Sequence, residues 1–397
     1  MRYYLSCIIF FVCSALFAQD PVKSLVDKLA DSYLENGNGA LVIGVKTNGV
    51  SRIYYYGKKA SDKNVLPDSS DIFEIGGITE TFTSIVLADK AMKGEMRIDG
   101  RLQDYLDANV PAVVYQPFIC QPVDLGADPD YNSGDDYLRV KFKPIMCLPD
   151  SSYEPQPVLL CYLASHTSGI PDLPNNLHSK ISDQPLSNYS KDDLYAFLKD
   201  YHIENPIGFD YRHSQLGIAL LGQAISVRMQ KEYETILTEC ILDSLGMGSS
   251  TISLSDEQKL KLLQGHNKKG VKAAASSFKA FAPVLGLHST PEDMMKFLSA
   301  NISISKDHIS NVLDYTHNPR LKAKANDDTE IALGWKINSV NDQGMKMVWQ
   351  SGMTNGFAAF VGFVETSHFG VFVLSSKAKS TDILGRELIK QIVANSN

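Results

Sequence analysis

The chain has 397 residues, of which 44% are hydrophobic and 21% are charged, and its formal net charge is −7. These proportions are ordinary for a globular protein and argue against a disordered, collagen-like or coiled-coil chain. Because binding to phosphates needs clustered Lys and Arg, the acidic balance argues against a nucleic-acid partner, and it gives no reason to expect adhesion to an anionic membrane.

The first eighteen residues, MRYYLSCIIFFVCSALFA, predict a secretory signal peptide. Arg2 is followed by an uncharged run, and small residues stand before the polar pair Gln19-Asp20. The run is shorter than the roughly 20 apolar residues that span a bilayer, and its end suits signal cleavage. We therefore expect an exported protein, secreted or periplasmic, with residues 19–397 as its folded domain. An uncleaved membrane anchor is the alternative.

The elements predicted next are a helix and a hairpin. Apolar residues recur with helical spacing over 19–36, and Gly37 ends the helix. Residues 40–56 indicate two strands joined at Asn48-Gly49, a strong hairpin signal. Helical patterns follow at 78–93, 102–106, 159–164, 191–200, 216–229 and 233–245, strands at 332–340, 345–350, 358–363 and 369–374, and a last helix at 382–394.

The order of these elements predicts an α+β fold. Strands occur at both ends of the chain and helices in the middle, so we expect an antiparallel sheet formed by both chain ends and flanked by helices, with a helical subdomain inserted between them.

Residues 109–157 fit this scheme poorly and are expected to form an irregular insertion rich in proline and aromatic residues. From Pro111 to Pro157 there are eight prolines and six Tyr or Phe residues, without a helical period. Such insertions are often functional, and this one either covers an apolar flank, which we favour, or binds a glycan or peptide by stacking. Within it, Asp128–Asp136 spaces oxygen donors as calcium loops do, but Arg139 stands where the closing acid belongs, which favours a solvated acidic turn.

Four cysteines follow the signal. Cys120 and Cys147 lie in the irregular insertion and are the expected disulfide pair, since disulfides are permitted in exported proteins. Cys161 and Cys240 fall in apolar helical stretches and are expected to be free. No CxxC motif occurs, so the sequence predicts no metal and no cofactor.

Three short segments carry the functional pattern. They are FEIGGITETFT at 73–83, PIGFDYRHSQLG at 206–217 and WQSGMTNGF at 349–357, and they occur together with SHTSGIPD at 165–172, GLHSTPED at 286–293 and LGW at 333–335. In order and spacing these segments resemble the serine β-lactamase-like superfamily, which includes class C β-lactamases, D-alanyl-D-alanine carboxypeptidases and related esterases. The resemblance runs from about residue 22 to residue 392, interrupted by the insertion.

The resemblance implies a sheet with helices on both sides and a cleft beside the helical subdomain. Family members attack an acyl group with the serine of a Ser-x-x-Lys motif at a helix start, where residues three apart share one helical face. A Tyr-x-Asn motif adds a proton-transfer group, and a Lys- or His-Thr-Gly strand holds the substrate. Two backbone N–H groups, here those of Gly77 and Met353, stabilise the oxyanion.

The chain departs from this pattern at the decisive positions. Gly77 stands where the nucleophilic serine belongs, and Glu80 where the lysine belongs. Tyr211 is retained, but His213 replaces the asparagine. In the third motif Gln350 and Ser351 replace the basic residue and the threonine, whereas Gly352 remains. Thr79 cannot substitute for the serine, because two residues along a helix turn the side chain by about 200°.

We therefore predict a non-catalytic binding or scaffolding relative, a pseudoenzyme. Because Glu80 and Gln350 replace basic residues, the cleft favours a neutral or cationic small molecule or peptide. The cleft candidates are Gly77, Glu80, Tyr211, His213, Gln350, Ser351, Gly352 and Met353.

Two rival hypotheses remain. The first is a hydrolase in which Glu80, Tyr211 and His213 activate water on an ester or amide, and the second is an ordinary hydrolase of the family. His166 and His288 are expected to brace loops, and Tyr211 can equally be a packed aromatic residue.

Overall fold

The computed structural model describes residues 21–34, 39–47, 49–59, 64–122, 145–177, 184–322 and 328–395. The predicted signal peptide and the acidic loop Asp128–Asp136 lie outside the described residues. No helix in the described ranges is long and apolar enough to cross a membrane.

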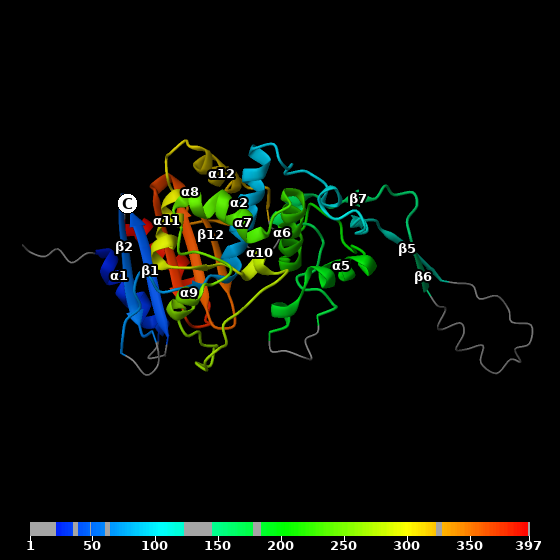
Figure 1. Ribbon diagram of the computed structural model, residues 1–397. Helices are drawn as coiled ribbons and strands as arrows, with labels where there is room; N and C mark the ends of the chain where they lie inside the picture. The colour runs from blue at the N-terminus through cyan, green and yellow to red at the C-terminus, as the bar shows by residue number, and fades with distance from the viewer. Residues whose placement is uncertain are drawn as a thin grey trace, which may run out of the picture.

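An antiparallel sheet of eight strands forms the centre of the fold, in the order β2-β1-β14-β13-β12-β11-β10-β9. Strand β1 from the start of the chain pairs along its length with β14 from the end, so the prediction that both chain ends complete one sheet is confirmed (Figure 1). The strands are β1 Ala40–Thr47, β2 Val50–Gly57, β9 Leu321–Lys322, β10 Glu330–Ile331, β11 Lys336–Ser339, β12 Lys346–Met353, β13 Ala358–Val364 and β14 Phe369–Ser375.

Helices cover both faces of the sheet, as expected. On one face α1 (Pro21–Leu34) and α13 (Asp382–Asn395) pack against each other and against β1, β13 and β14. On the other face α11 (Pro291–Asn301) packs on the same three strands and leads into the helical block. Each face has its own buried apolar cluster, which explains why the central strands are buried on both sides.

The helical block lies between the first and last strands of the sequence. Its elements are β3 Phe73–Glu74, η1 Gly76–Ile78, α2 Thr79–Met92, η2 Leu102–Tyr105, α4 Leu160–Ala164, η3 Pro185–Asn188, α5 Lys191–Asp200, α6 Gln215–Met229, α7 Tyr233–Leu237, η4 Thr238–Leu242, α8 Asp243–Leu245, α9 Asp256–Lys261, α10 Ala282–Leu285, β8 His288–Ser289 and α12 His308–Thr316; the short turn η5 Glu365–Ser367 joins β13 to β14.

One sequence prediction near the end of the sheet needs correction. The strand predicted from residue 332 begins only at Lys336, because Gly334 adopts a left-handed conformation (φ 74°) and turns the chain. The helix predicted over 233–245 is confirmed: α7, the π-helical turn η4 and α8 follow one another without interruption from Tyr233 to Leu245. Helices α11 and α12 were not predicted, although each of them buries one face.

The described β5–β6 part of the insertion projects away from the helical block (Figure 1). Two short pairs of strands form the described part of the insertion: β4 Val114–Tyr115 with β7 Gln156–Pro157, and β5 Phe118–Pro122 with β6 Ile145–Pro149. A disulfide joins β5 to β6 through Cys120 and Cys147, the pair expected from the sequence, and Cys161 and Cys240 are free.

Candidate functional site

Glu80 lies at the centre of the candidate site, in the first turn of α2, and only 2% of it is exposed. A carboxylate is favourable in this place, because the unpaired N–H groups of a helix start carry partial positive charge. The turn around Gly334 packs against the first turn of α2, where a Cβ on Gly334 would lie 3.1 Å from Glu80 O. The same turn contacts the end of α4, because the Gly334 N–H donates a hydrogen bond to Ala164 O (2.9 Å). The end of α4 is therefore held next to Glu80.

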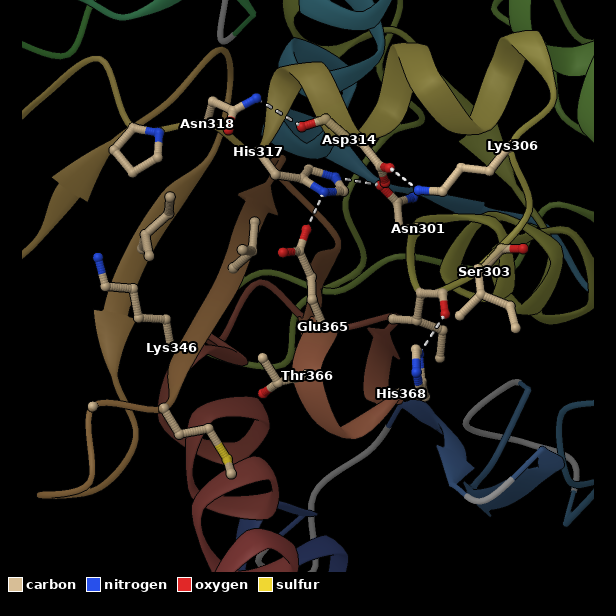
Figure 2. A pocket seen from close by; sticks show the side chains of 17 residues that line it. Asn301, Ser303, Lys306, Asp314, His317, Asn318, Lys346, Glu365, Thr366 and His368 are labelled. Carbon is tan, nitrogen blue, oxygen red and sulfur yellow. Dashed lines mark hydrogen bonds and ion pairs between the residues drawn. The ribbon is translucent and has the colours of Figure 1, made fainter.

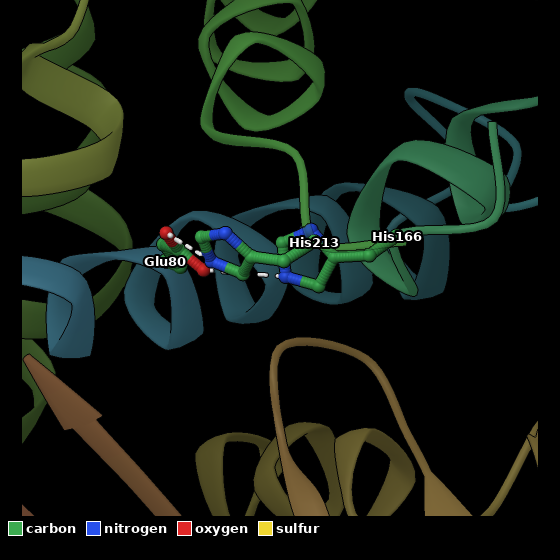
Figure 3. Close-up of side chains that lie close together, drawn as sticks. All are labelled: Glu80, His166 and His213. Carbon is green, nitrogen blue, oxygen red and sulfur yellow. Dashed lines mark ion pairs between the residues drawn. The ribbon is translucent and has the colours of Figure 1, made fainter. Parts of the chain in front are cut away.

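Two imidazoles face the Glu80 carboxylate (Figure 3). His166 Nε2 lies 3.2 Å from Glu80 Oε2, and His213 Nε2 lies 3.4 Å from Oε1. His213 also places Nδ1 3.1 Å from Asp172 Oδ1. Backbone hydrogen bonds hold the two loops together, since Arg212 N–H donates to His166 O (2.8 Å).

His166 was predicted only to brace a loop, and the structure shows that it also forms an ion pair with Glu80. Its Nδ1 accepts a hydrogen bond from the Ser214 N–H (3.2 Å), which braces the start of α6. Because Nδ1 is the acceptor, a neutral His166 carries its proton on Nε2, the nitrogen next to Glu80. The sequence signal for this position was its segment, SHTSGIPD, which also supplies Asp172.

The side chains of the cluster are charged at neutral pH. Burial raises the pKa of Glu80, but the imidazoles of His166 and His213 outweigh this effect and lower it to about 2. Burial lowers the pKa of His213, but Asp172 and Glu80 outweigh it and raise the pKa to about 9. At neutral pH, Glu80 is therefore anionic and His213 is cationic.

This charge pattern predicts how stability changes with pH. Because the pKa of His213 rises from 6.5 to about 9 on folding, its contribution is complete below pH 6.5 and disappears as the pH rises through 9. Between these pH values we expect the melting temperature of the wild type to fall more steeply than that of His213→Gln, measured by thermal unfolding in matched buffers. Parallel curves for the two proteins would contradict the assignment.

Tyr211 packs edge-on against the His166 ring, with 5.7 Å between ring centroids. Burial raises the pKa of its hydroxyl, and the carboxylates of Glu80 and Asp172 act in the same direction. Tyr211 therefore remains protonated at neutral pH.

Strand β12 forms the other wall of the site, beside Gly77. A Cβ built on Gly77 would lie 3.2 Å from Ser351 O and 3.8 Å from Glu80 Oε1. Gln350 is buried, and its amide donates to Gly334 O (3.1 Å) and accepts from the Ser351 N–H (3.0 Å). The Gln350 side chain thus braces the wall, whereas Met353 at the end of β12 is exposed.

With the fold and this geometry in place, comparison with known proteins identifies the family. The model of a family described as Beta-lactamase matches residues 26–394. The chain belongs to the beta-lactamase family.

The relatives and solved structures agree with this assignment. A beta-lactamase of Lysobacter lactamgenus is 20% identical, with 95% of this chain and 94% of the relative covered. The D-alanyl-D-alanine-carboxypeptidase/endopeptidase AmpH of Escherichia coli K12 is 22% identical, with 92% and 86% covered. A solved beta-lactamase/D-alanine carboxypeptidase from Yersinia pestis, complexed with citrate, has the same fold, with a TM-score of 0.72, 21% identity, and 94% and 98% covered.

A hollow of the fold lies away from this cluster, between α11, α12 and the start of β12, and has a volume of about 740 Å³ (Figure 2). Its buried His317 contacts Glu365 through Nδ1 (2.5 Å) and Asn301 through Nε2 (2.9 Å), so both ring nitrogens have partners. None of the residues predicted from the beta-lactamase motifs lines it.

Proposed function

We propose that this member of the beta-lactamase family is exported and binds a ligand in its cleft without forming an acyl-enzyme. The observation that carries the proposal is residue 77. Its Cβ position lies 3.8 Å from Glu80 Oε1 in the cleft wall, but glycine presents no oxygen there. Without a nucleophile and with a carboxylate in place of the lysine, the family's acyl transfer has neither of its two reacting groups.

The neighbouring hydroxyl does not replace the missing nucleophile. Thr79 is fully buried, and its Oγ1 accepts a hydrogen bond from the Leu287 N–H (3.2 Å). Its side chain is therefore directed into the core, as the helical geometry predicts.

Direct activation of water by Glu80, Tyr211 and His213 is the rival function, and the charge pattern disfavours it. A general base works best with a pKa near the working pH. The pKa of Glu80 is about 2, which makes it a weak base, and the pKa of His213 is about 9, so it already holds its proton at neutral pH. Glu80 and His213 satisfy each other electrostatically and are poorly suited to removing a proton from water.

The accessible part of the cluster favours a neutral or cationic ligand. Asp172 is exposed along about half of its side chain and His213 along 42%, whereas Glu80 is buried behind them. Two carboxylates and one imidazolium leave a net negative charge at this wall, which repels the carboxylate of a penicillin or of a peptide C-terminus.

Covalent trapping tests the proposal. Incubation of the purified protein with a penicillin, an activated ester or a fluorophosphonate is expected to leave its intact mass unchanged, because position 77 has no oxygen to acylate. An active family serine hydrolase, treated in parallel, is the positive control. An adduct mapped to the cleft would overturn the proposal, and turnover without an adduct that Glu80→Gln abolishes would support the water-activation rival instead.

A further inference from the structure

The Glu80 cluster has the chemistry of a metal site as well as that of an ion pair. Glu80, His166 and His213 each offer one ligand atom, and these atoms lie within 4.8 Å of one another. Two imidazoles and one carboxylate form a recognised ligand set for zinc sites that keep an open coordination position.

The spacing of Glu80 and His166 fits zinc, and His213 needs only a small movement to complete the set. With bonds of about 2.0–2.1 Å at tetrahedral angles, two ligand atoms on one zinc ion lie roughly 3.3–3.4 Å apart. Glu80 Oε2 lies 3.2 Å from His166 Nε2, which matches this spacing. His213 Nε2 lies 3.4 Å from the other carboxylate oxygen, Oε1, and with one ligand atom from each residue the three atoms lie within 4.8 Å of one another. The His213 side chain is half-exposed, so its ring can move closer to Glu80 Oε2 and His166 Nε2. The side chains of Glu80 and His166 are held in place by burial.

Two buried atoms of the cluster lack a hydrogen bond. Glu80 Oε2 and His166 Nε2 are inaccessible to solvent and face each other, but neither forms a hydrogen bond of acceptable geometry with any described residue. The two atoms lie 3.2 Å apart, within ion-pair distance, but without hydrogen-bond geometry, so their mutual contact leaves the hydrogen-bonding capacity of both unused, which is unusual for buried polar atoms. A cation placed between the two atoms would satisfy both.

The surroundings of His213 are those of a zinc-ligating histidine. Its Nδ1 faces Asp172 Oδ1 at 3.1 Å, and a carboxylate behind a ligating imidazole orients the ring and strengthens it as a ligand. Gly77 lies beside the cluster, since a Cβ built on it would be 3.8 Å from Glu80 Oε1, and it has no side chain that could compete for the fourth position.

We propose that Glu80, His166 and His213 bind one zinc ion, with its fourth position open to the cleft at Gly77. Binding at His166 Nε2 moves the proton of that ring to Nδ1, so it costs the hydrogen bond from Ser214 N–H. The proton that His213 Nε2 carries is released at the same time. The zinc site goes beyond the proposed function, which needs no metal. The charge argument given there for a neutral or cationic ligand describes the metal-free cluster, because zinc binding with release of the His213 proton removes the net negative charge of Glu80, His213 and Asp172.

Calorimetry on the chelator-stripped protein tests the site. We expect one zinc ion per chain, and no comparable binding of magnesium or calcium, because these ions prefer oxygen ligands. Each of Glu80→Gln, His166→Asn and His213→Gln is expected to weaken zinc binding by more than about 100-fold, and Asp172→Asn by about 10–100-fold. Asparagine suits position 166, because this residue has a positive φ of 56°.

His202→Ala is the matched control, since His202 is exposed and lies outside the cluster, and it is expected to leave the affinity unchanged. Cobalt substitution gives a second measurement on the wild type, independent of how the variants fold: a tetrahedral site gives an intense visible absorption band. Absence of that band, or zinc binding that survives both Glu80→Gln and His166→Asn, would overturn the proposal. These results leave the trapping experiment unaffected, so the two proposals fail separately.

Discussion

The double substitution Gly77→Ser/Glu80→Lys is expected to restore acyl transfer. The backbone at Gly77 has an ordinary conformation, and an added Cβ meets Ser351 O at 3.2 Å, so a serine fits with a shift of a few tenths of an ångström. A lysine at position 80 would be buried, and burial lowers the pKa of an amine toward the range of a useful base. Tyr211 remains in place to assist.

The expected gain is large, because loss of a catalytic serine costs about 10⁶-fold in other serine hydrolases. We expect hydrolysis of an activated ester to rise by at least about 10³-fold over the wild type, with a trapped acyl-enzyme at Ser in position 77, measured by stopped-flow kinetics and mass spectrometry. Gly77→Ser alone keeps the Glu80 carboxylate beside the new hydroxyl and serves as the matched comparison, with little gain. A folded double variant without any gain would show that the cleft has lost the shape needed for acyl transfer.

Gly352→Ala is expected to cause a large loss of stability. This glycine lies where β12 meets η1, and a Cβ there would stand 2.1 Å from Ile75 O and 2.4 Å from Gly77 N. Both contacts are with backbone atoms, which cannot turn aside as a flexible side chain can. Overpacking typically costs about 1–3 kcal/mol, and we expect at least the upper end of this range, measured as the free energy of unfolding in urea.

The matched control for this substitution is Gly248→Ala. Gly248 is exposed, has nothing within 4 Å of its Cβ position, and is expected to change stability by no more than about 0.5 kcal/mol. Equal effects of the two substitutions would show that the backbone of β12 does not pack closely against Ile75 and Gly77 in the turn before α2. A selective loss at Gly352 would confirm that glycine is required there for packing.

Local patterns predicted most of the sheet and the longer helices. The hairpin at Asn48-Gly49, the alternating strands near the end of the chain and the apolar period of α2 and α6 agree with the structure to within a few residues. The failures occurred where a long-range contact overrides the local pattern, as at Gly334, whose turn is fixed by packing against α2. The short strands β9 and β10 have too few residues to show a period of two.

The amino-acid sequence by itself determined which chemical groups the site holds: a glycine at 77, a carboxylate at 80, a tyrosine at 211 and an imidazole at 213. Only the tertiary structure decided that His166 forms an ion pair with Glu80 and that Asp172 contacts the far side of the His213 ring. It also decided that the Gln350 amide is hydrogen-bonded to the backbone carbonyl of Gly334. The reason is physical: residue types and their order are local properties, whereas the few ångströms that separate residues 80, 166 and 213 result from packing three distant segments against one another.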